Sequence, residues 1–212
     1  MKYKFSYWYF FVHYIKEYLK EEFGKERAKD IIVSSKKEYR KLLNRAEDIG
    51  GRNPMAKNMY FAMVFLAFHV AYPETFDQRG LEALLAALYR KKGFTKWIRL
   101  LNVNNPRHFK MLKKKLLKAA NWIDVREAQY PTSWKFRFPD VHRDGFYYEF
   151  TKCPIAEFFK KNGYDELTPL FCQIDYKNIE LARGKLYREK TLATGDDVCD
   201  FWLVPDKVKN PR

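Results

Sequence analysis

The sequence predicts an α+β fold, in which an N-terminal helical layer packs on a small antiparallel sheet with two inserted helices. Three observations support this prediction. Apolar residues recur at helical spacing through roughly the first 120 residues. The spacing then changes to strict alternation from Trp134 onward. The chain closes with two apolar segments that flank a turn rich in glycine and aspartate, which is typical of a hairpin.

The length of 212 residues favours a single domain over 1–212. Within it we expect a helical part at 1–121, an α+β part at 122–204 that carries the cysteines, and a tail at 205–212. Hydrophobic residues make up 47% of the chain and aromatic residues 18%, which is enough to build a full core.

The helical part is expected to contain six helices. The helix that follows Gly50-Gly51 is apolar on nearly every side, so it should be buried, with Asn53 as its N-cap and Pro54 at its first position. The last helix carries a run of lysines that we expect to face water. The predicted helices cover 5–22, 25–48, 54–72, 77–92, 94–102 and 106–121.

The α+β part begins with two strands that place aromatic residues on one face, at 134–138 and 146–151. Two short helices at 154–162 and 169–182 follow. The closing hairpin is expected to pair 186–193 with 198–204. Its simplest register places Thr191 beside Asp200 and sets Cys199 and Asp200 on opposite faces.

Charge and composition restrict the partners. The net charge is +15, yet residues 146–212 carry eleven basic and eleven acidic side chains. No nucleic-acid module accompanies the basic part, so we expect no specific nucleic-acid partner and instead a small anionic substrate. The longest apolar run, 59–72, is too short for a membrane span. Three cysteines without a secretory signal favour the cytoplasm, and a homo-oligomer is compatible with the sequence.

The three cysteines are the strongest pointer to a site. Cys153 precedes Pro154 and should cap a helix, and Cys172 should end the first turn of the next helix. Because helix N-termini favour a thiolate, we expect lowered pKa values for these two thiols. Cys199 belongs to the closing hairpin. The alternative interpretation is that each cysteine is a small buried hydrophobic residue.

A metal site is not indicated by spacing. The cysteines form no CxxC pair, and the four histidines are scattered and have no ligand spacing with a cysteine. The sequence requires no cofactor, although a divalent metal is compatible with it. The histidines are His13, His69, His108 and His142, the last of these in a predicted turn at 139–145.

Other polar residues could complete a site around the cysteines. Asp175 follows Cys172 by three residues and shares its helix face. Arg188 could bind a carboxylate with two hydrogen bonds. Thr191 and Glu149 are further candidates for substrate binding. Asp175 and Asp200 are the candidates for general acid–base catalysis.

In these motifs the chain resembles the L-2-amino-thiazoline-4-carboxylic acid hydrolase family. The matching residues are Thr151-Lys152-Cys153-Pro154-Ile155, Gly163, Glu166-Leu167, Pro169-Leu170-Phe171-Cys172, Asp175, Arg188, Thr191-Leu192-Ala193-Thr194-Gly195 and Cys199-Asp200-Phe201. The resemblance implies hydrolytic opening of a cyclic amidine thioether to a carbamoyl-cysteine, as part of cysteine metabolism.

The resemblance does not assign roles to residues. Our hypothesis is that Cys172 or Cys153 is the nucleophile, that Asp175 or Asp200 transfers protons, and that Arg188 binds the substrate carboxylate. Two other functions stay open at this point. One is a small-molecule-binding or sensor domain without catalysis, and the other is a basic module that binds nucleic acid or a protein partner.

Overall fold

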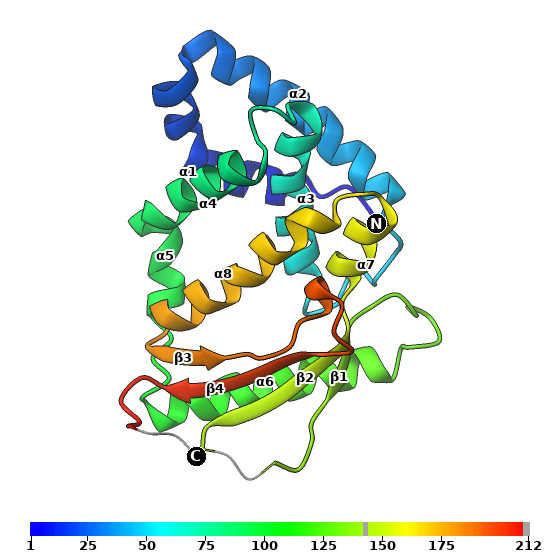
Figure 1. The fold of residues 1–212 in the computed structure, drawn as a ribbon, viewed down its shortest axis with the longest axis vertical. Coiled ribbons are helices and arrows are strands. Elements are labelled where there is room, and N and C mark those ends of the chain that lie inside the picture. The colour runs from blue at the N-terminus through cyan, green and yellow to red at the C-terminus, as the bar shows by residue number, and fades with distance from the viewer. Residues whose placement is uncertain (142–143, 210–212) are drawn as a thin grey trace. The chain divides into compact units, whose positions relative to one another are not determined.

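The computed structural model describes residues 1–141 and 144–209 (Figure 1), so His142 lies outside the described residues. It has the predicted α+β composition, with helices followed by a four-stranded antiparallel sheet. The chain divides into two compact units, Met1–Thr95 and Lys96–Arg212. The single domain over 1–212 stays a prediction.

The first unit is helical. Its core includes Trp8, Tyr39 and Phe68, and the indole of Trp8 stacks on the Phe68 ring with centroids 5.7 Å apart. Gly24 has φ 78° and separates the first two helices, a conformation that favours glycine. The helices of this unit are α1 (Phe5–Phe23), α2 (Lys25–Arg45), α3 (Ala56–Ala71) and α4 (Gln78–Arg90), and α5 (Lys92–Arg99) crosses the boundary.

Helix α3 is buried along most of its length, as its apolar sequence predicts. Its predicted start is wrong. The helix begins at Ala56, and Asn53 is not its N-cap. Instead, the Asn53 side chain accepts a hydrogen bond from the Met55 N–H at 2.8 Å and donates one to the Ile49 carbonyl at 2.7 Å. This local bonding forms a turn before the helix, which explains the delay.

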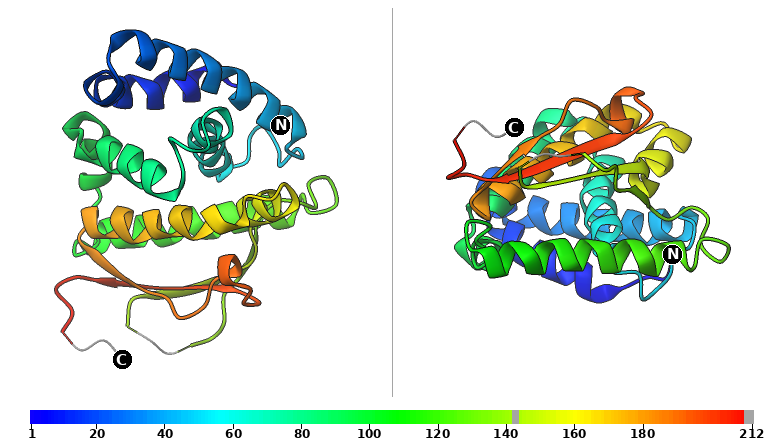
Figure 2. Two further views of the ribbon diagram at one scale, coloured as in Figure 1. Left: turned by 45° about the horizontal axis from the view of Figure 1, so that its top comes forward. Right: turned by 90° about the horizontal axis from the view of Figure 1, so that it is seen from below.

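The second unit contains the sheet. Its strands are β1 (Lys135–Arg137), β2 (Phe146–Lys152), β3 (Gly184–Tyr187) and β4 (Cys199–Pro205), in the order β1-β2-β4-β3. The helices α6 (Pro106–Asp124) and α8 (Thr168–Leu181) lie on one side of this sheet (Figure 2). A shorter helix, α7 (Pro154–Lys161), follows β2, and 3-10 turns occupy Asp165–Leu167 and Leu192–Thr194.

The two faces of the sheet differ in chemistry. On the face toward α6 and α8, here the helix face, Tyr148 pairs with Phe201 and Phe150 pairs with Cys199. On the opposite face, Glu149 pairs directly with Asp200. Alternation along β2 and β4 therefore sends a thiol and aromatic rings to one face and two carboxylates to the other.

One lysine of α6 does not face water as predicted. The Lys113 ammonium donates to the Gly145 carbonyl at 2.7 Å and lies over the Phe109 and Phe146 rings. Partial burial lowers the pKa of Lys113. The aliphatic part of a lysine side chain can pack on apolar residues while its ammonium group donates to a carbonyl. The charge of Lys113 therefore does not require that its side chain face water.

Strand β3 lies very close to α8 because it begins with glycine. A Cβ atom at Gly184 would lie 2.9 Å from the Ile179 Cγ2 and 3.0 Å from the Val103 Cγ2. The Val103 N–H also donates to the Ala182 carbonyl, at 2.9 Å. A side chain at 184 would force these atoms apart, so glycine sets this approach.

The predicted hairpin is wrong in length and register. β3 ends at Tyr187, which pairs with Trp202, and Leu186 pairs with Leu203. Thr191 therefore does not pair with Asp200. Ladder pairing stops because the next N–H groups bind carboxylate side chains, and Leu192–Thr194 then form a 3-10 turn. The turn ends at Gly195, whose φ of 96° is left-handed.

Candidate active site

Two of the three cysteines meet at one threonine. The Thr191 hydroxyl lies 3.8 Å from the Cys172 sulfur on α8 and 3.4 Å from the Cys199 sulfur on β4. The Leu192 N–H also donates to the Cys199 sulfur, at 3.2 Å. Cys172 is half-buried and Cys199 is buried, and both are free thiols. The structure thus brings together three residues that lie far apart in the sequence.

Cys153 lies at the N-cap of α7, as its position before Pro154 predicts. It is a half-buried free thiol. Ionisation of Cys172 or Cys199 would raise the Cys153 pKa further, because like charges repel. Cys153 is therefore close enough to the other two thiols to feel their charge, whereas the contacts at Thr191 join Cys172 and Cys199.

The expectation of lowered thiol pKa values is wrong. Burial raises the pKa of Cys153 to about 12, and the N–H groups of Ala156 and Ile155 at the start of α7 oppose this only in part. Burial likewise raises the pKa of Cys172 to about 11, against the lowering effect of the Thr191 hydroxyl. Desolvation of a thiolate outweighs the field of a helix N-terminus here. Cys172 is also one residue further along its helix than predicted, since α8 begins at Thr168.

A buried arginine lies beside the thiols. The Arg188 Nη2 donates to the Asp175 Oδ2 at 2.8 Å, and its Nη1 donates to the Cys172 carbonyl at 3.2 Å. The guanidinium lies 3.9 Å from the Phe201 ring centroid and 5.3 Å from that of Tyr176, so cation–π contacts restrict it further. Its side chain is 4% exposed, and its Nε is buried without a hydrogen-bond partner among the described residues.

Asp175 is the more accessible partner of this pair, with 43% of its side chain exposed. Burial raises the pKa of the Asp175 carboxyl, and the Arg188 charge and hydrogen bond oppose that shift. A carboxyl with a raised pKa is closer to the range in which it can act as a general acid or base. Asp175 also raises the pKa of Cys172, which fits its place one helical turn away.

A cleft of about 850 Å³ runs beside the site between α8 and β3. Tyr176 lines the cleft, and its ring also contacts the Arg188 guanidinium, which itself is not among the lining residues. The cleft is lined by Gln173, Tyr176, Lys177, Glu180, Gly184, Lys185, Leu186 and Tyr187.

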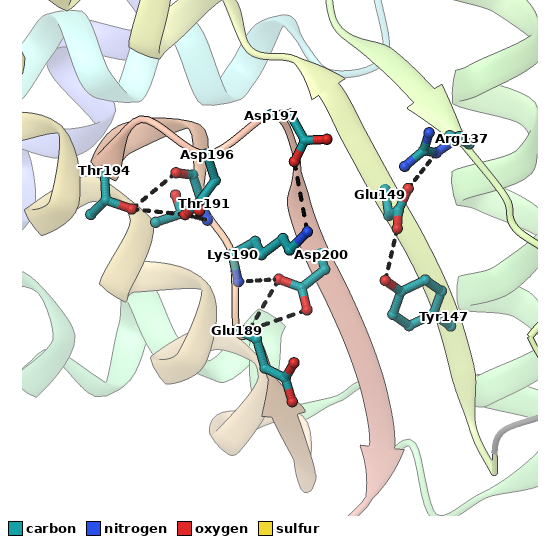
Figure 3. Close-up of polar contacts among 10 residues, drawn as sticks. All are labelled: Arg137, Tyr147, Glu149, Glu189, Lys190, Thr191, Thr194, Asp196, Asp197 and Asp200. Carbon is teal, nitrogen blue, oxygen red and sulfur yellow. Dashed lines mark hydrogen bonds and ion pairs between the residues drawn. The ribbon is translucent and has the colours of Figure 1, made fainter.

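Two predicted site residues lie on the opposite face of the sheet (Figure 3). Glu149 accepts hydrogen bonds from the Arg137 Nε at 2.5 Å and the Tyr147 hydroxyl at 2.8 Å. Asp200 accepts hydrogen bonds from the backbone N–H groups of Glu189 and Lys190. The sheet therefore separates both carboxylates from the thiols. Direct contacts bring together Cys172, Cys199, Asp175, Arg188 and Thr191, and Cys153 lies within electrostatic range of the other two thiols.

Some residues of the site were not predicted from the sequence. Tyr176 and Phe201 flank the guanidinium, and the Leu192 N–H binds a thiol. Phe201 lies in a motif that carries the family resemblance, so its position was a signal. Tyr176 gives no such signal beyond its place next to Asp175, because an aromatic residue on a helix is usually packing.

Two general properties bear on the function. Within 1–141 and 144–209, no helix is long and apolar enough to cross a bilayer. In the same part of the chain, no three histidine, cysteine or acidic side chains converge in a way that could bind a metal ion.

The fold and the site define an α+β protein with a thiol-lined, arginine-containing interior beside a surface cleft. A family model described as L-2-amino-thiazoline-4-carboxylic acid hydrolase matches residues 57–203, and the chain belongs to that family. The match includes all three cysteines, Asp175 and Arg188. No curated protein and no solved structure matches the chain.

Proposed function

We propose that this protein is a hydrolase that opens the ring of a small cyclic amidine thioether carrying a carboxylate, such as 2-aminothiazoline-4-carboxylate. The observation that carries the proposal is the buried Arg188, which has an unused Nε donor beside Cys172. A buried cation with a spare donor suits an anionic ligand. The family name supplies the thiazoline as the substrate class.

Substrate binding would use the cleft between α8 and β3. Lys185 and Lys177 line this cleft and would attract an anion toward it. The carboxylate would then accept a hydrogen bond from the Arg188 Nε, which would satisfy a buried donor that otherwise lacks a partner. The Phe201 and Tyr176 rings restrict the guanidinium and so orient the bound carboxylate.

Cys172 is the proposed nucleophile. Its pKa of about 11 means that it is a thiol at neutral pH, so a base must remove its proton during attack. Asp175 lies one turn along α8 and would accept that proton. The sulfur then bonds to the ring carbon between nitrogen and sulfur, and the bond from this carbon to the ring sulfur breaks. Asp175 returns the proton to the departing sulfur.

Water completes the reaction. It attacks the carbon that is now bonded to Cys172, while Asp175 accepts a proton from the water. The bond from this carbon to the Cys172 sulfur breaks, and the sulfur regains the proton. The second proton of the water moves from the new oxygen to nitrogen as the carbonyl forms. One water is consumed, and the product is a carbamoyl-cysteine with a free thiol. A reducing cytoplasm would suit a protein that depends on free thiols, and a role in cysteine metabolism follows from this product.

A second candidate is a domain of the same fold that binds a small anion without catalysis. The raised pKa values of Cys172 and Cys153 favour it, because a thiol is a much weaker nucleophile than a thiolate. The two candidates share the Arg188 binding role. They differ in whether the ring is opened.

The test is turnover of 2-aminothiazoline-4-carboxylate by the wild-type protein and by Cys172→Ser, followed as release of product thiol. We expect turnover in the wild type and a loss of at least about 10³-fold in Cys172→Ser. Cys153→Ser is the matched variant, since it removes the other candidate nucleophile, a second half-buried free thiol. Turnover that survives in Cys172→Ser and is lost in Cys153→Ser would show that Cys153, and not Cys172, is the nucleophile. Binding without turnover in the wild type would favour the second candidate.

A further inference from the structure

Arg188 and Thr191 belong to a segment with unusual backbone bonding. After Tyr187 the chain leaves the β3–β4 ladder, so the N–H groups of residues 189–191 need other partners. The structure provides carboxylates for all three. Asp200 accepts from the Glu189 N–H at 3.0 Å and from the Lys190 N–H at 2.6 Å, and Asp196 accepts from the Thr191 N–H at 2.8 Å (Figure 3).

Hydrogen bonds from N–H groups to a carboxylate are stronger than those to a carbonyl. Asp200 is buried, and its second oxygen also accepts from the Glu189 N–H, at 3.1 Å. Asp196 adds a bond from the Thr194 hydroxyl at 3.0 Å, which ties the segment to the 3-10 turn. The backbone of residues 189–191 is therefore bound by two carboxylates. Asp200 lies on β4, and Asp196 lies in the loop that leads to β4.

The side chains on either side of these N–H groups point to the helix face. Arg188 comes directly before residues 189–191, and its side chain pairs with Asp175. Thr191 is the last of these residues, and its hydroxyl contacts both the Cys172 and the Cys199 sulfurs. We propose that Asp200 and Asp196 are positioning residues, which act through the backbone of 189–191 to place Arg188 and Thr191 at the thiols. For the role of Arg188, this inference rests on the proposed function.

This assignment changes the role of Asp200, which was a candidate for general acid–base catalysis. Its carboxylate lies on the face opposite Cys199, as alternation predicts, and it accepts hydrogen bonds from two backbone groups. A group that acts through the backbone should change substrate binding and thiol protection. It should leave the pH dependence of turnover unchanged, because it transfers no proton.

Protection of the thiols can be measured without any turnover. Native protein is treated with iodoacetamide, and carbamidomethylation of Cys172 and Cys199 is followed by site-resolved mass spectrometry. In Asp200→Ala we expect both rates to rise by about tenfold or more, because the segment opens locally when its charged acceptor is lost. Asp196→Ala should give a smaller rise, since Asp196 is exposed and binds one N–H of this segment.

Asp197→Ala is the matched control. Asp197 lies in the same turn and is exposed, but it pairs with the Lys190 ammonium at 3.9 Å. Its thiol rates should equal those of the wild type. Asp200→Asn retains one side-chain oxygen acceptor, so its rates should fall between those of the wild type and Asp200→Ala. If Asp200→Ala does not fold, the folded Asp200→Asn decides the question.

Thiol rates equal to wild type in the folded Asp200 variants would overturn the proposal, whatever the kinetics show. With a substrate that turns over, Asp200→Asn should raise KM by about tenfold with an unshifted pH profile. A shifted profile would make Asp200 a proton-transfer group and reject the positioning role. If the wild type does not open the thiazoline, the proposed function fails, while the alkylation rates still test the positioning role.

Discussion

Two arginine–carboxylate pairs lie on opposite faces of the same sheet and are built in opposite ways. On the helix face, the Arg188 side chain is 4% exposed and its partner Asp175 is 43% exposed. On the other face, Arg137 is 56% exposed and Glu149 is 9% exposed. The cation is therefore buried in one pair and the anion in the other.

The difference shows which member of a pair depends on its partner. A buried charge needs a partner because water cannot solvate it, whereas an exposed charge is solvated already. Arg188 depends on Asp175, and Glu149 depends on Arg137 and on the Tyr147 hydroxyl. The Arg188 Nε also lacks a hydrogen-bond partner among the described residues. This unused donor is the reason why the helix face suits an anionic ligand.

The largest expected effect comes from removing the exposed partner of the buried arginine. Asp175→Ala leaves Arg188 buried without its counter-ion and should lower the free energy of unfolding by about 2–4 kcal/mol. Arg188→Met leaves a half-exposed carboxylate that water can solvate, so it should cost less, about 1 kcal/mol. Chemical denaturation of both variants measures the difference. A greater loss in Arg188→Met would contradict the comparison.

The second pair should show the same asymmetry with the charges exchanged. Arg137→Gln leaves the buried Glu149 carboxylate with the Tyr147 hydroxyl as its remaining described partner, so it should lower Tm more than Glu149→Gln, which removes the buried charge itself. Thermal unfolding of the two variants checks this order. Neither variant should change thiol alkylation rates on the helix face, and a change there would show that the two faces are coupled.

The smallest effect concerns the pH response of the thiols beside the first pair. Because burial raises the pKa of Cys172 to about 11, its thiolate forms at higher pH than that of an unfolded cysteine of pKa 9.0. Alkylation of native Cys172 should therefore keep rising through about pH 11, whereas the unfolded protein should reach its plateau earlier. Cys153 should rise further still, to about pH 12. A native plateau near pH 9 would mean that burial does not control these thiols.

The sequence predicted the fold class far better than the electrostatics of the candidate site. Helical and alternating patterns are local, so the α+β class and most elements followed from them. The Pro154 and Pro169 signals placed Cys153 and Cys172 near helix starts. The pKa directions failed because desolvation depends on how much of the chain covers each thiol, and no local pattern reports that.

The hairpin failed for another reason. Alternation of side chains predicts a strand through 186–193, but the backbone of 189–191 binds the side chains of Asp196 and Asp200. Competition between a ladder and side-chain acceptors depends on where the aspartates lie in space. In the sequence, Asp196 is typical of an ordinary turn. The observed pairing of Leu186 with Leu203 is shifted by two residues from the register in which Thr191 would pair with Asp200.

The glycine that begins β3 has a consequence for the site four residues later. Because position 184 has no side chain, the first residue of β3 can lie close to the Ile179 side chain of α8. Asp175 lies on α8 and Arg188 directly follows the last residue of β3, and the two side chains form a 2.8 Å hydrogen bond. A methyl group at position 184 would push the start of β3 away from α8. The distance between Arg188 and Asp175 should therefore increase if position 184 carries a side chain.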